Sequence, residues 1–221
     1  QISLVSDQVL WARVFQNNNI VWSRSTDGGN TWQTGYFSLG NSNLTITQIE
    51  AVSATKAYIT AFSSNPAVSG GVWVTEDGGQ TWNKQITAFS SSSSPFPNFI
   101  HFFDTNNGLV MGDAQNGIDF EIYTTSNGGL NWNLVDANNI PNIGTDEYGY
   151  TTKYEARGNS IWFGTNKGRI FKSDDQGAHW TVFQSPIYDF DDSETGGQFA
   201  FKNSNDGLLT TRNGNLWETH N

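Results

Sequence analysis

Apolar and polar residues alternate in short runs along this chain, and each run ends in a cluster of Gly, Asn, Asp or Ser. Residues 120–124, for example, read Phe-Glu-Ile-Tyr-Thr, and residues 169–172 read Arg-Ile-Phe-Lys. A period of two is typical of β-strands that bury one face, whereas an amphipathic helix has a period near 3.6, which no long stretch shows. We therefore expect an all-β protein with almost no helix.

One eight-residue phrase occurs four times and ends each time in a tryptophan. The copies read STDGGNTW at residues 25–32, TEDGGQTW at 75–82, TSNGGLNW at 125–132 and SDDQGAHW at 173–180. Their tryptophans are 50, 50 and 48 residues apart. A regular period of this length marks a repeat protein.

Each phrase predicts a hairpin turn, because Asp-Gly and Asn-Gly pairs tolerate positive φ. We interpret its side chains as structural: the Asp or Asn accepts N–H bonds across the turn, the Ser or Thr hydroxyl bonds locally, and the Trp buries a ring under the turn. The residues given this role are Ser25, Asp27, Gly29, Trp32, Thr75, Asp77, Gly79, Trp82, Thr125, Asn127, Gly129, Trp132, Ser173, Asp175, Gly177 and Trp180.

One alternating run leads into each phrase, one follows it and two further runs lie upstream, which gives four strands in about 50 residues. This is the content of one β-propeller blade. We predict one propeller segment with blades at about 1–40, 41–92, 93–142 and 143–187, and part of a fifth at 188–221.

The fifth unit predicts that the chain is part of a larger ring. Residues 214–221 align with 168–175, so that Asn221 takes the place of the box Asp. We expect further blades of the same parent chain to complete the ring. The serine tract 90–94, followed by Pro95 and Pro97, predicts a flexible connection between the second and third units.

Composition narrows the range of partners. The chain carries a net charge of −10 with only 11 scattered Lys and Arg residues, which argues against nucleic acid. No stretch approaches 18 apolar residues, so we expect no membrane insertion. Cysteine is absent, which excludes disulfides, Cys-ligated zinc and thiol catalysis. A composition rich in Gly, Asn, Ser and Thr is typical of secreted bacterial β-proteins, so we expect a secreted or cell-surface location.

The four phrases resemble the Asp-box (BNR) repeat, Ser-x-Asp-x-Gly-x-Thr-Trp, of sialidases, sortilin-type receptors and some xyloglucan-degrading enzymes. The first copy fits at every defined position, whereas the third has Asn127 and Asn131 and the fourth has His179. The blades look most like the photosystem II assembly-factor-like and sortilin-like repeats of secreted Bacteroidota proteins. This resemblance implies a propeller fold, a structural box and export by the type IX system, but no particular activity.

Enzymatic alternatives depend on few residues. A sialidase needs an arginine triad, and this chain has five arginines, of which Arg24 and Arg169 are expected on solvated outer strands. A glycosidase needs two carboxyl groups about 5–10 Å apart. The candidates are Asp104, Asp113, Asp119, Glu121, Asp146 and Glu147. Residues 104–108 recur as 203–207, which indicates a turn, so we predict no catalytic residue.

Metal binding has weak support. The acidic run 188–194 could offer oxygen ligands to Ca²⁺, but a solvated loop between blades is the simpler interpretation. His101, His179 and His220 lie in three different units. We therefore expect no metal and no cofactor.

The ligand-contact hypothesis concerns one loop, in which exposed rings can stack on a ligand. Its residues are Asp146, Glu147, Tyr148 and Tyr150, although Tyr150 could instead pack between blades. We predict a non-enzymatic secreted or cell-surface scaffold that binds a protein or glycan through loops at one end of the ring. The alternative is part of a glycoside hydrolase, sialidase- or xyloglucanase-like, whose active site is completed by missing blades.

Overall fold

The computed structural model describes residues 1–90 and 94–220. Ser91, Ser92 and Ser93 of the predicted flexible connection lie outside the described residues, as does Asn221 of the predicted fifth phrase.

The described residues form five antiparallel sheets. The first holds β1 (Ile2–Leu4), β2 (Leu10–Gln16), β3 (Asn19–Ser25) and β4 (Gln33–Tyr36). The second holds β5 (Leu44–Ala51), β6 (Ala57–Ser63), β7 (Gly71–Thr75) and β8 (Asn83–Gln85), and the third holds β9 (Pro97–Phe102), β10 (Gly108–Gly112), β11 (Glu121–Thr125) and β12 (Asn133–Leu134). The fourth holds β13 (Gly149–Arg157), β14 (Ser160–Thr165), β15 (Arg169–Ser173) and β16 (Thr181–Gln184), and the fifth holds β17 (Gly197–Phe201), β18 (Asp206–Thr211) and β19 (Leu216–His220).

Helix is almost absent, as the alternating pattern predicts. Among the described residues the one helical element is a 3₁₀ turn, η1 (Ala137–Asn139). No helix in residues 1–90 or 94–220 has the length and hydropathy that a membrane span requires.

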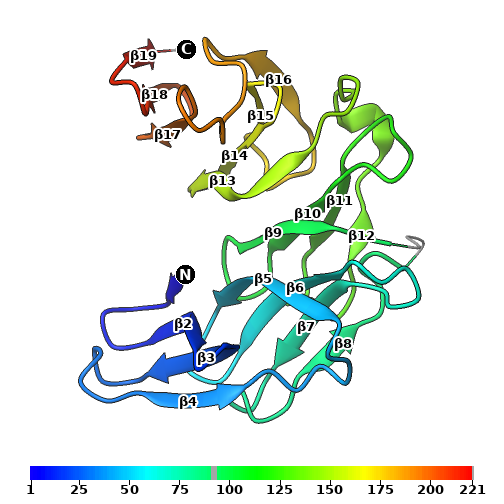
Figure 1. The fold of residues 1–221 in the computed structure, drawn as a ribbon, viewed down its shortest axis with the longest axis vertical. Helices are drawn as coiled ribbons and strands as arrows, with labels where there is room; N and C mark the ends of the chain where they lie inside the picture. The colour runs from blue at the N-terminus through cyan, green and yellow to red at the C-terminus, as the bar shows by residue number, and fades with distance from the viewer. Residues whose placement is uncertain (91–93, 221) are drawn as a thin grey trace.

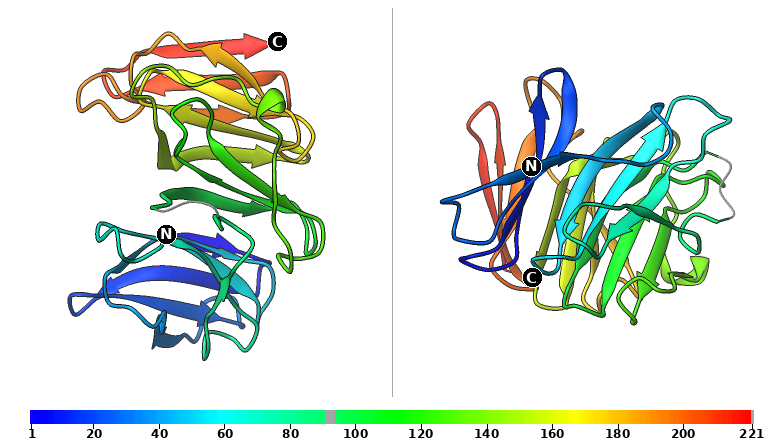
Figure 2. Two further views of the ribbon diagram at one scale, coloured as in Figure 1. Left: turned by 90° about the vertical axis from the view of Figure 1, so that its right-hand side faces the viewer. Right: turned by 90° about the horizontal axis from the view of Figure 1, so that it is seen from below.

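Each sheet is a meander in which strands follow one another in chain order. The sheets succeed each other along an open arc, with their first strands on its inner side, and the described part of the chain forms no closed ring (Figures 1 and 2). The fold is therefore an all-β arrangement of propeller blades, four with four strands and a fifth with three.

The core lies between neighbouring blades. Trp11 and Trp22 of the first sheet pack with Ile49, Ile59 and Trp82 of the second, and all five are buried. A blade with a neighbour on each side must bury both of its faces. For this reason β7, which reads Gly-Val-Trp-Val-Thr, is buried along its whole length and shows no polar alternation.

Side chains join the inner strands of successive blades. The amide of Gln48 accepts the Ile100 N–H at 2.8 Å and donates to the Ile100 carbonyl at 2.9 Å. Two residues along β5, Glu50 accepts the Phe102 N–H at 3.3 Å. An inner strand is an edge strand whose backbone groups on one side have no partner strand, so these bonds supply the missing partners.

The same device recurs at two other junctions. Between the first and second blades, Gln1 accepts the Ile49 N–H at 3.0 Å and Ser3 accepts the Ala51 N–H at 2.8 Å. Between the fourth and fifth, Glu155 accepts the Phe201 N–H at 2.8 Å. The first strand of a blade therefore carries polar side chains that hold the next blade.

Candidate functional site

All four boxes share one hydrogen-bond network. In the first, Ser25 Oγ accepts the Gly29 N–H at 2.8 Å and donates to Asp27 Oδ1 at 2.7 Å. Asp27 Oδ1 also accepts the Thr31 N–H at 2.9 Å, and Asp27 Oδ2 accepts the Thr31 hydroxyl. The Thr31 hydroxyl and N–H lower the pKa of Asp27 to about 2. These bonds close the turn and leave the carboxylate occupied by its own loop.

The other three boxes vary the side chains but keep the acceptor. In the third box Asn127 Oδ1 accepts the Asn131 N–H at 3.0 Å, as Asp27 does for Thr31. In the fourth, Asp175 accepts the His179 N–H at 2.9 Å and lies 2.6 Å from the His179 ring nitrogen. His179 therefore bonds within its own turn.

The second glycine of the later boxes touches the preceding blade. A Cβ at Gly79 would lie 2.6 Å from Trp22, and one at Gly129 would lie 2.9 Å from Tyr58. At Gly177 it would lie 2.7 Å from Leu109. The box thus closes a turn and also fits the neighbouring sheet.

The first box differs from the prediction that its tryptophan is buried. Trp32 is 44% exposed, whereas Trp82, Trp132 and Trp180 are 4–6% exposed. The turn is the same, but the described chain supplies no sheet on the outer face of the first blade (Figure 1). Burial of the indole therefore comes from the neighbouring blade and not from the turn.

Both arginines expected on solvated outer strands are partly buried, and both are paired with groups of the chain. Arg24 donates to the Ala54 carbonyl of the second blade at 2.7 Å and lies over the ring of Trp11. Arg169 forms an ion pair with Glu147, whose side chain is fully buried. The prediction was wrong for these two side chains because the second blade covers Arg24, and the loop before β13 covers Arg169.

Glu147 fixes the loop in which it was predicted to contact a ligand. Its carboxylate accepts the Gly144 N–H at 2.7 Å and the Thr165 hydroxyl at 2.6 Å, in addition to Arg169. Burial by itself would raise the pKa of Glu147, but Arg169 and these donors together hold it below its ordinary value. A carboxylate with all these partners fixes the conformation of the loop from its buried side.

The other members of the predicted contact loop lie nearer the surface. Asp146 is exposed with φ of 54°, and Tyr148 is 44% exposed. The rings of Tyr148 and Tyr150 meet edge to face at 5.5 Å, and the Tyr150 hydroxyl donates to Asp189 at 2.6 Å. Tyr150 therefore packs between the loops that precede the fourth and fifth blades, and ligand contact by this loop stays a prediction.

The remaining candidate carboxylates have partners in their own chain. Asp104 accepts the Asn106 and Asn107 N–H groups at 2.7 and 2.8 Å, a turn that Asn203 repeats in the fifth blade. Asp113 accepts the Gly149 N–H at 3.0 Å, and burial raises its pKa.

Asp119 and Glu121 also bond locally. Asp119 accepts from the Asn116 amide at 2.8 Å, and Glu121 accepts the Tyr123 hydroxyl at 2.7 Å. These carboxylates close turns or fix neighbouring side chains.

The acidic run bonds to its own loop. Asp192 Oδ1 accepts N–H groups from Glu194 at 2.9 Å and Thr195 at 2.6 Å. Across the described residues, no three His, Cys, Asp or Glu side chains come together in a group that could hold a metal ion.

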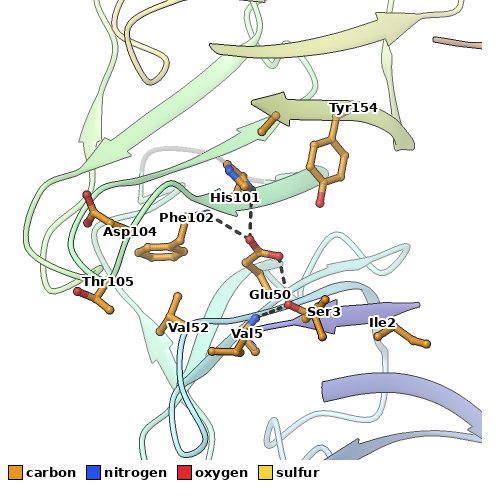
Figure 3. A pocket seen from close by; sticks show the side chains of 13 residues that line it. Ile2, Ser3, Val5, Glu50, Val52, His101, Phe102, Asp104, Thr105 and Tyr154 are labelled. Atoms are coloured by element: carbon orange, nitrogen blue, oxygen red, sulfur yellow. Dashed lines mark hydrogen bonds and ion pairs between the residues drawn. The ribbon is translucent and has the colours of Figure 1, made fainter. Parts of the chain in front are cut away.

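The inner strands of the first four blades surround a groove of about 540 Å³, which we call the central groove (Figure 3). Its apolar lining residues include Ile2, Leu4, Val5, Val52 and Phe102, and its polar ones are Ser3, Glu50, His101, Asp104, Thr105 and Tyr154. Asp104 and Thr105 place the groove toward the edge of the sheets that carries the boxes, because their loop bonds to the third box through the Gly128 N–H and the Asn106 carbonyl, at 2.8 Å. The predicted Tyr148 loop lies at the opposite end.

Glu50 lies at the centre of the groove. One carboxylate oxygen is 3.2 Å from His101 Nδ1, and the other accepts the Ser3 hydroxyl at 3.5 Å. The Glu50 and His101 side chains keep 15% and 23% of their surfaces exposed, respectively. The Tyr154 hydroxyl accepts from the Gln48 amide at 2.5 Å, and burial together with the Glu50 charge raises its pKa. The groove thus offers a carboxylate, an imidazole and a phenol among apolar side chains.

Sequence reasoning missed this groove, since Glu50 and His101 are 51 positions apart and belong to no shared motif. One signal was present. Gln48 and Glu50 alternate on a first strand, as Lys153 and Glu155 do in the fourth unit. Polar pairs at matching places on inner strands predict side chains that reach across to a neighbouring blade.

No protein-family model and no curated protein sequence matches this chain. Solved structures do. A GH74 enzyme from Niastella koreensis shares 13% identity at a TM-score of 0.67, and the match covers all of this chain and 36% of the enzyme. A Hadza microbial sialidase shares 12% identity at 0.56 over 95% of this chain and 52% of that one. A protein of unknown function from Dyadobacter fermentans shares 13% identity at a TM-score of 0.52, and the match covers 95% of this chain and 74% of that protein.

These similarities concern the fold alone. With the five meander sheets, they confirm the predicted class, an all-β protein built from β-propeller blades. The chain spans about a third of the length of the GH74 enzyme and about half that of the sialidase.

Proposed function

We propose that this chain is a non-enzymatic binding scaffold, secreted or displayed on a bacterial surface, that holds a protein or glycan ligand in the central groove. The observation that carries the proposal is the contrast between the candidate carboxylates and the groove. Asp113 and Glu147 accept hydrogen bonds that fix loops, while the groove offers partly exposed polar groups together with apolar side chains. A concave surface of this mixed character is typical of ligand sites.

The charge of the groove favours a ligand with hydrogen-bond donors. Glu50 and Asp104 are acidic and His101 is the one basic side chain among the lining residues. A sugar hydroxyl or a peptide N–H can donate to Glu50 while an apolar face contacts Val52 and Phe102.

We further propose that the blades belong with the photosystem II assembly-factor-like and sortilin-like repeats of secreted Bacteroidota proteins, exported by the type IX system. Four regularly spaced boxes and the absence of cysteine support this placement. We also propose that further blades of the parent chain cover the exposed Trp32, since each buried box tryptophan lies against a preceding blade.

A binding assay run beside a hydrolysis assay tests the proposal. Xyloglucan oligosaccharides, sialyllactose and a panel of peptides are titrated by calorimetry, and aryl glycosides are incubated with the same preparation. We expect binding without turnover, and Glu50→Gln should weaken it about tenfold, or about 1.4 kcal/mol.

The Glu50→Gln variant is suited to this purpose because an amide can keep the blade junction. On the same strand the Gln48 amide already accepts a backbone N–H of the third blade, which is the kind of bond that Glu50 makes to Phe102. The melting temperature should therefore stay close to that of the parent. Tyr148→Ala, at the opposite end, serves as the second arm: if it abolishes binding and Glu50→Gln does not, the ligand contacts the Tyr148 loop. Hydrolysis that Glu50→Gln abolishes would overturn the scaffold function and favour the hydrolase alternative.

A further inference from the structure

An apolar cavity of about 620 Å³ lies between the fourth and fifth sheets. The fourth sheet contributes Trp162 and Ile170, and the fifth contributes Phe199, Phe201, Leu209 and Trp217. The position of this cavity is independent of the central groove, because its walls come from β14 to β19 and not from the inner strands of the first three blades.

Strand register shows that these walls repeat the interface between the second and third blades. Tyr58 on β6 and Trp162 on β14 occupy the same place in their sheets, and Phe102 and Phe201 end their inner strands alike. The rings of Tyr58 and Phe102 stack at 4.3 Å, and those of Trp162 and Phe201 stack at 4.3 Å. The remaining walls correspond as Val72 with Ile170, Ile100 with Phe199, Val110 with Leu209 and Tyr123 with Trp217.

One component of the earlier interface has no counterpart in the later one. Between the second and third blades the space is filled by Trp132, which is 4% exposed and lies edge-on to Phe102 at 5.8 Å. Trp132 leads into β12, the fourth strand of its sheet. Among the described residues the fifth sheet ends with its third strand, β19, and brings no indole of this kind to the cavity.

The hydroxyl that accepts the backbone N–H of the box tryptophan also has a counterpart at this cavity. The Trp132 backbone N–H donates to the Thr87 hydroxyl at 2.9 Å. Thr87 lies two residues beyond Gln85, which pairs with Val72, and Ser185 lies two residues beyond Phe183, which pairs with Ile170. Ser185 lines the cavity. The cavity therefore has the aromatic walls and the hydroxyl that a box tryptophan uses elsewhere in the same molecule.

We propose that this cavity is the acceptor site for a tryptophan-bearing β-strand that adds to β19. The occupant is a peptide segment of the Asp-box type, outside residues 1–221, with a Gly-containing turn, a tryptophan and an extended run. Its indole enters the cavity edge-on to Phe201, its backbone N–H donates to Ser185 Oγ, and its extended run pairs with β19. Main-chain pairing supplies affinity and the indole supplies specificity, as in β-strand addition.

The probe is a peptide taken from this chain, Gly-Gly-Asn-Thr-Trp-Gln-Thr-Gly-Tyr, residues 28–36, acetylated and amidated. These residues follow the position that aligns with Asn221. The tryptophan carries a 5-fluoro label, so that ¹⁹F NMR reports its environment separately from the nine tryptophans of the protein. We expect a shifted, broadened ¹⁹F signal and a raised melting temperature, and the peptide with Ala in place of Trp should bind at least tenfold more weakly.

Two protein variants locate the site. Ile170→Phe fills the cavity and should abolish the ¹⁹F shift, and Ser185→Ala should weaken binding several-fold. The Ser185 hydroxyl also accepts the Ile187 N–H at 3.3 Å, so circular dichroism checks that the Ser185→Ala variant keeps the fold. Should Ile170→Phe fail to fold, the nine-residue sequence of the peptide is instead fused to the C-terminus of the unmodified protein. The extended chain with Trp should then melt higher than the same extension with Ala.

Other results would overturn the proposal. Equal binding of the Trp and Ala peptides, or no binding together with equal melting of the two extended chains, would show that the cavity does not select an indole. Concentration-dependent association that Trp32→Ala removes would show that a second copy fills the cavity instead.

Discussion

The first box and the three later boxes have the same turn but different surroundings. Ser25 and Asp27 make the same bonds as Thr75 and Asp77, down to the hydroxyl contact with the Thr that follows. Yet Trp32 is 44% exposed while Trp82 is 6% exposed. The eight-residue phrase therefore contains two separable parts, a turn that forms locally and an interface that forms only against another blade.

The largest expected effect comes from truncating a buried box tryptophan. Trp132→Ala should lower the free energy of unfolding by about 4 kcal/mol, because it opens a cavity between two blades. Trp32→Ala should cost about 1 kcal/mol, since that ring already contacts water. Urea unfolding followed by circular dichroism measures both. Equal losses would break the distinction between turn and interface.

The second glycine of the box gives the next largest contrast. Gly79 has φ of 96° and lies against Trp22, whereas Gly29 has φ of 89°. A Cβ added at Gly29 would meet only the ring of its own Trp32, at 3.9 Å. Gly79→Ala should cost about 3 kcal/mol from left-handed backbone and overpacking together, and Gly29→Ala about 1 kcal/mol from the backbone alone. Thermal melts of the two variants make the comparison. A Gly29→Ala loss as large as that of Gly79→Ala would place the whole cost in the turn.

Acid should weaken the first two boxes before the third. Hydrogen bonds led by the Thr31 and Thr81 hydroxyls depress the pKa values of Asp27 and Asp77 to about 2, below the ordinary value of 3.8. Because the folded pKa is the lower one, this stabilisation is complete above about pH 5 and is lost as the pH falls toward 2.

Asn127 accepts the corresponding backbone N–H through an amide, which does not titrate. An Asn at the Asp position is therefore the control for the loss of stability in acid. The double variant Asp27→Asn, Asp77→Asn should be less stable than the parent at pH 7 but should lose less between pH 5 and pH 2. Melting temperatures across that range test it. Parallel curves for parent and variant would show that these carboxylates do not govern the acid limb.

The smallest effect is expected at His179. Its backbone N–H, not its ring, makes the bond that every box shares, and its side chain is 69% exposed. His179→Thr restores the usual box residue and should change the stability at pH 7 by less than about 0.5 kcal/mol. A larger loss, measured by urea unfolding, would assign the imidazole a structural role of its own.

Local patterns predicted most of the strands. The alternating runs at residues 120–124 and 169–172 became β11 and β15 with ends shifted by one residue, because hairpin turns and period two act within a few positions. Strand β5 is longer, Leu44–Ala51, and its pairing with β6 passes a bulge between Ile46 and Gln48. This bulge interrupts the period of two along the strand, so the alternation alone does not predict its full length.

Contacts between residues far apart in the sequence could not be derived from local patterns. Within the fourth unit Glu147 pairs with Arg169 over 22 positions, and Glu50 meets His101 across two sheets. An Arg on an alternating strand looks solvated until a neighbouring loop is placed over it. The exposed Trp32 was missed for the opposite reason, because the phrase alone does not show which copy has a preceding blade.

The side-chain bonds between inner strands, such as Gln48 to Ile100, also bear on how the molecule yields to force. No continuous hydrogen-bonded sheet runs around the arc of described residues, so a pull on the two ends is resisted at a few discrete junctions rather than along one shared ladder. Rupture should then advance from one junction to the next, and each event should release a length of roughly fifty residues, the spacing of the repeat.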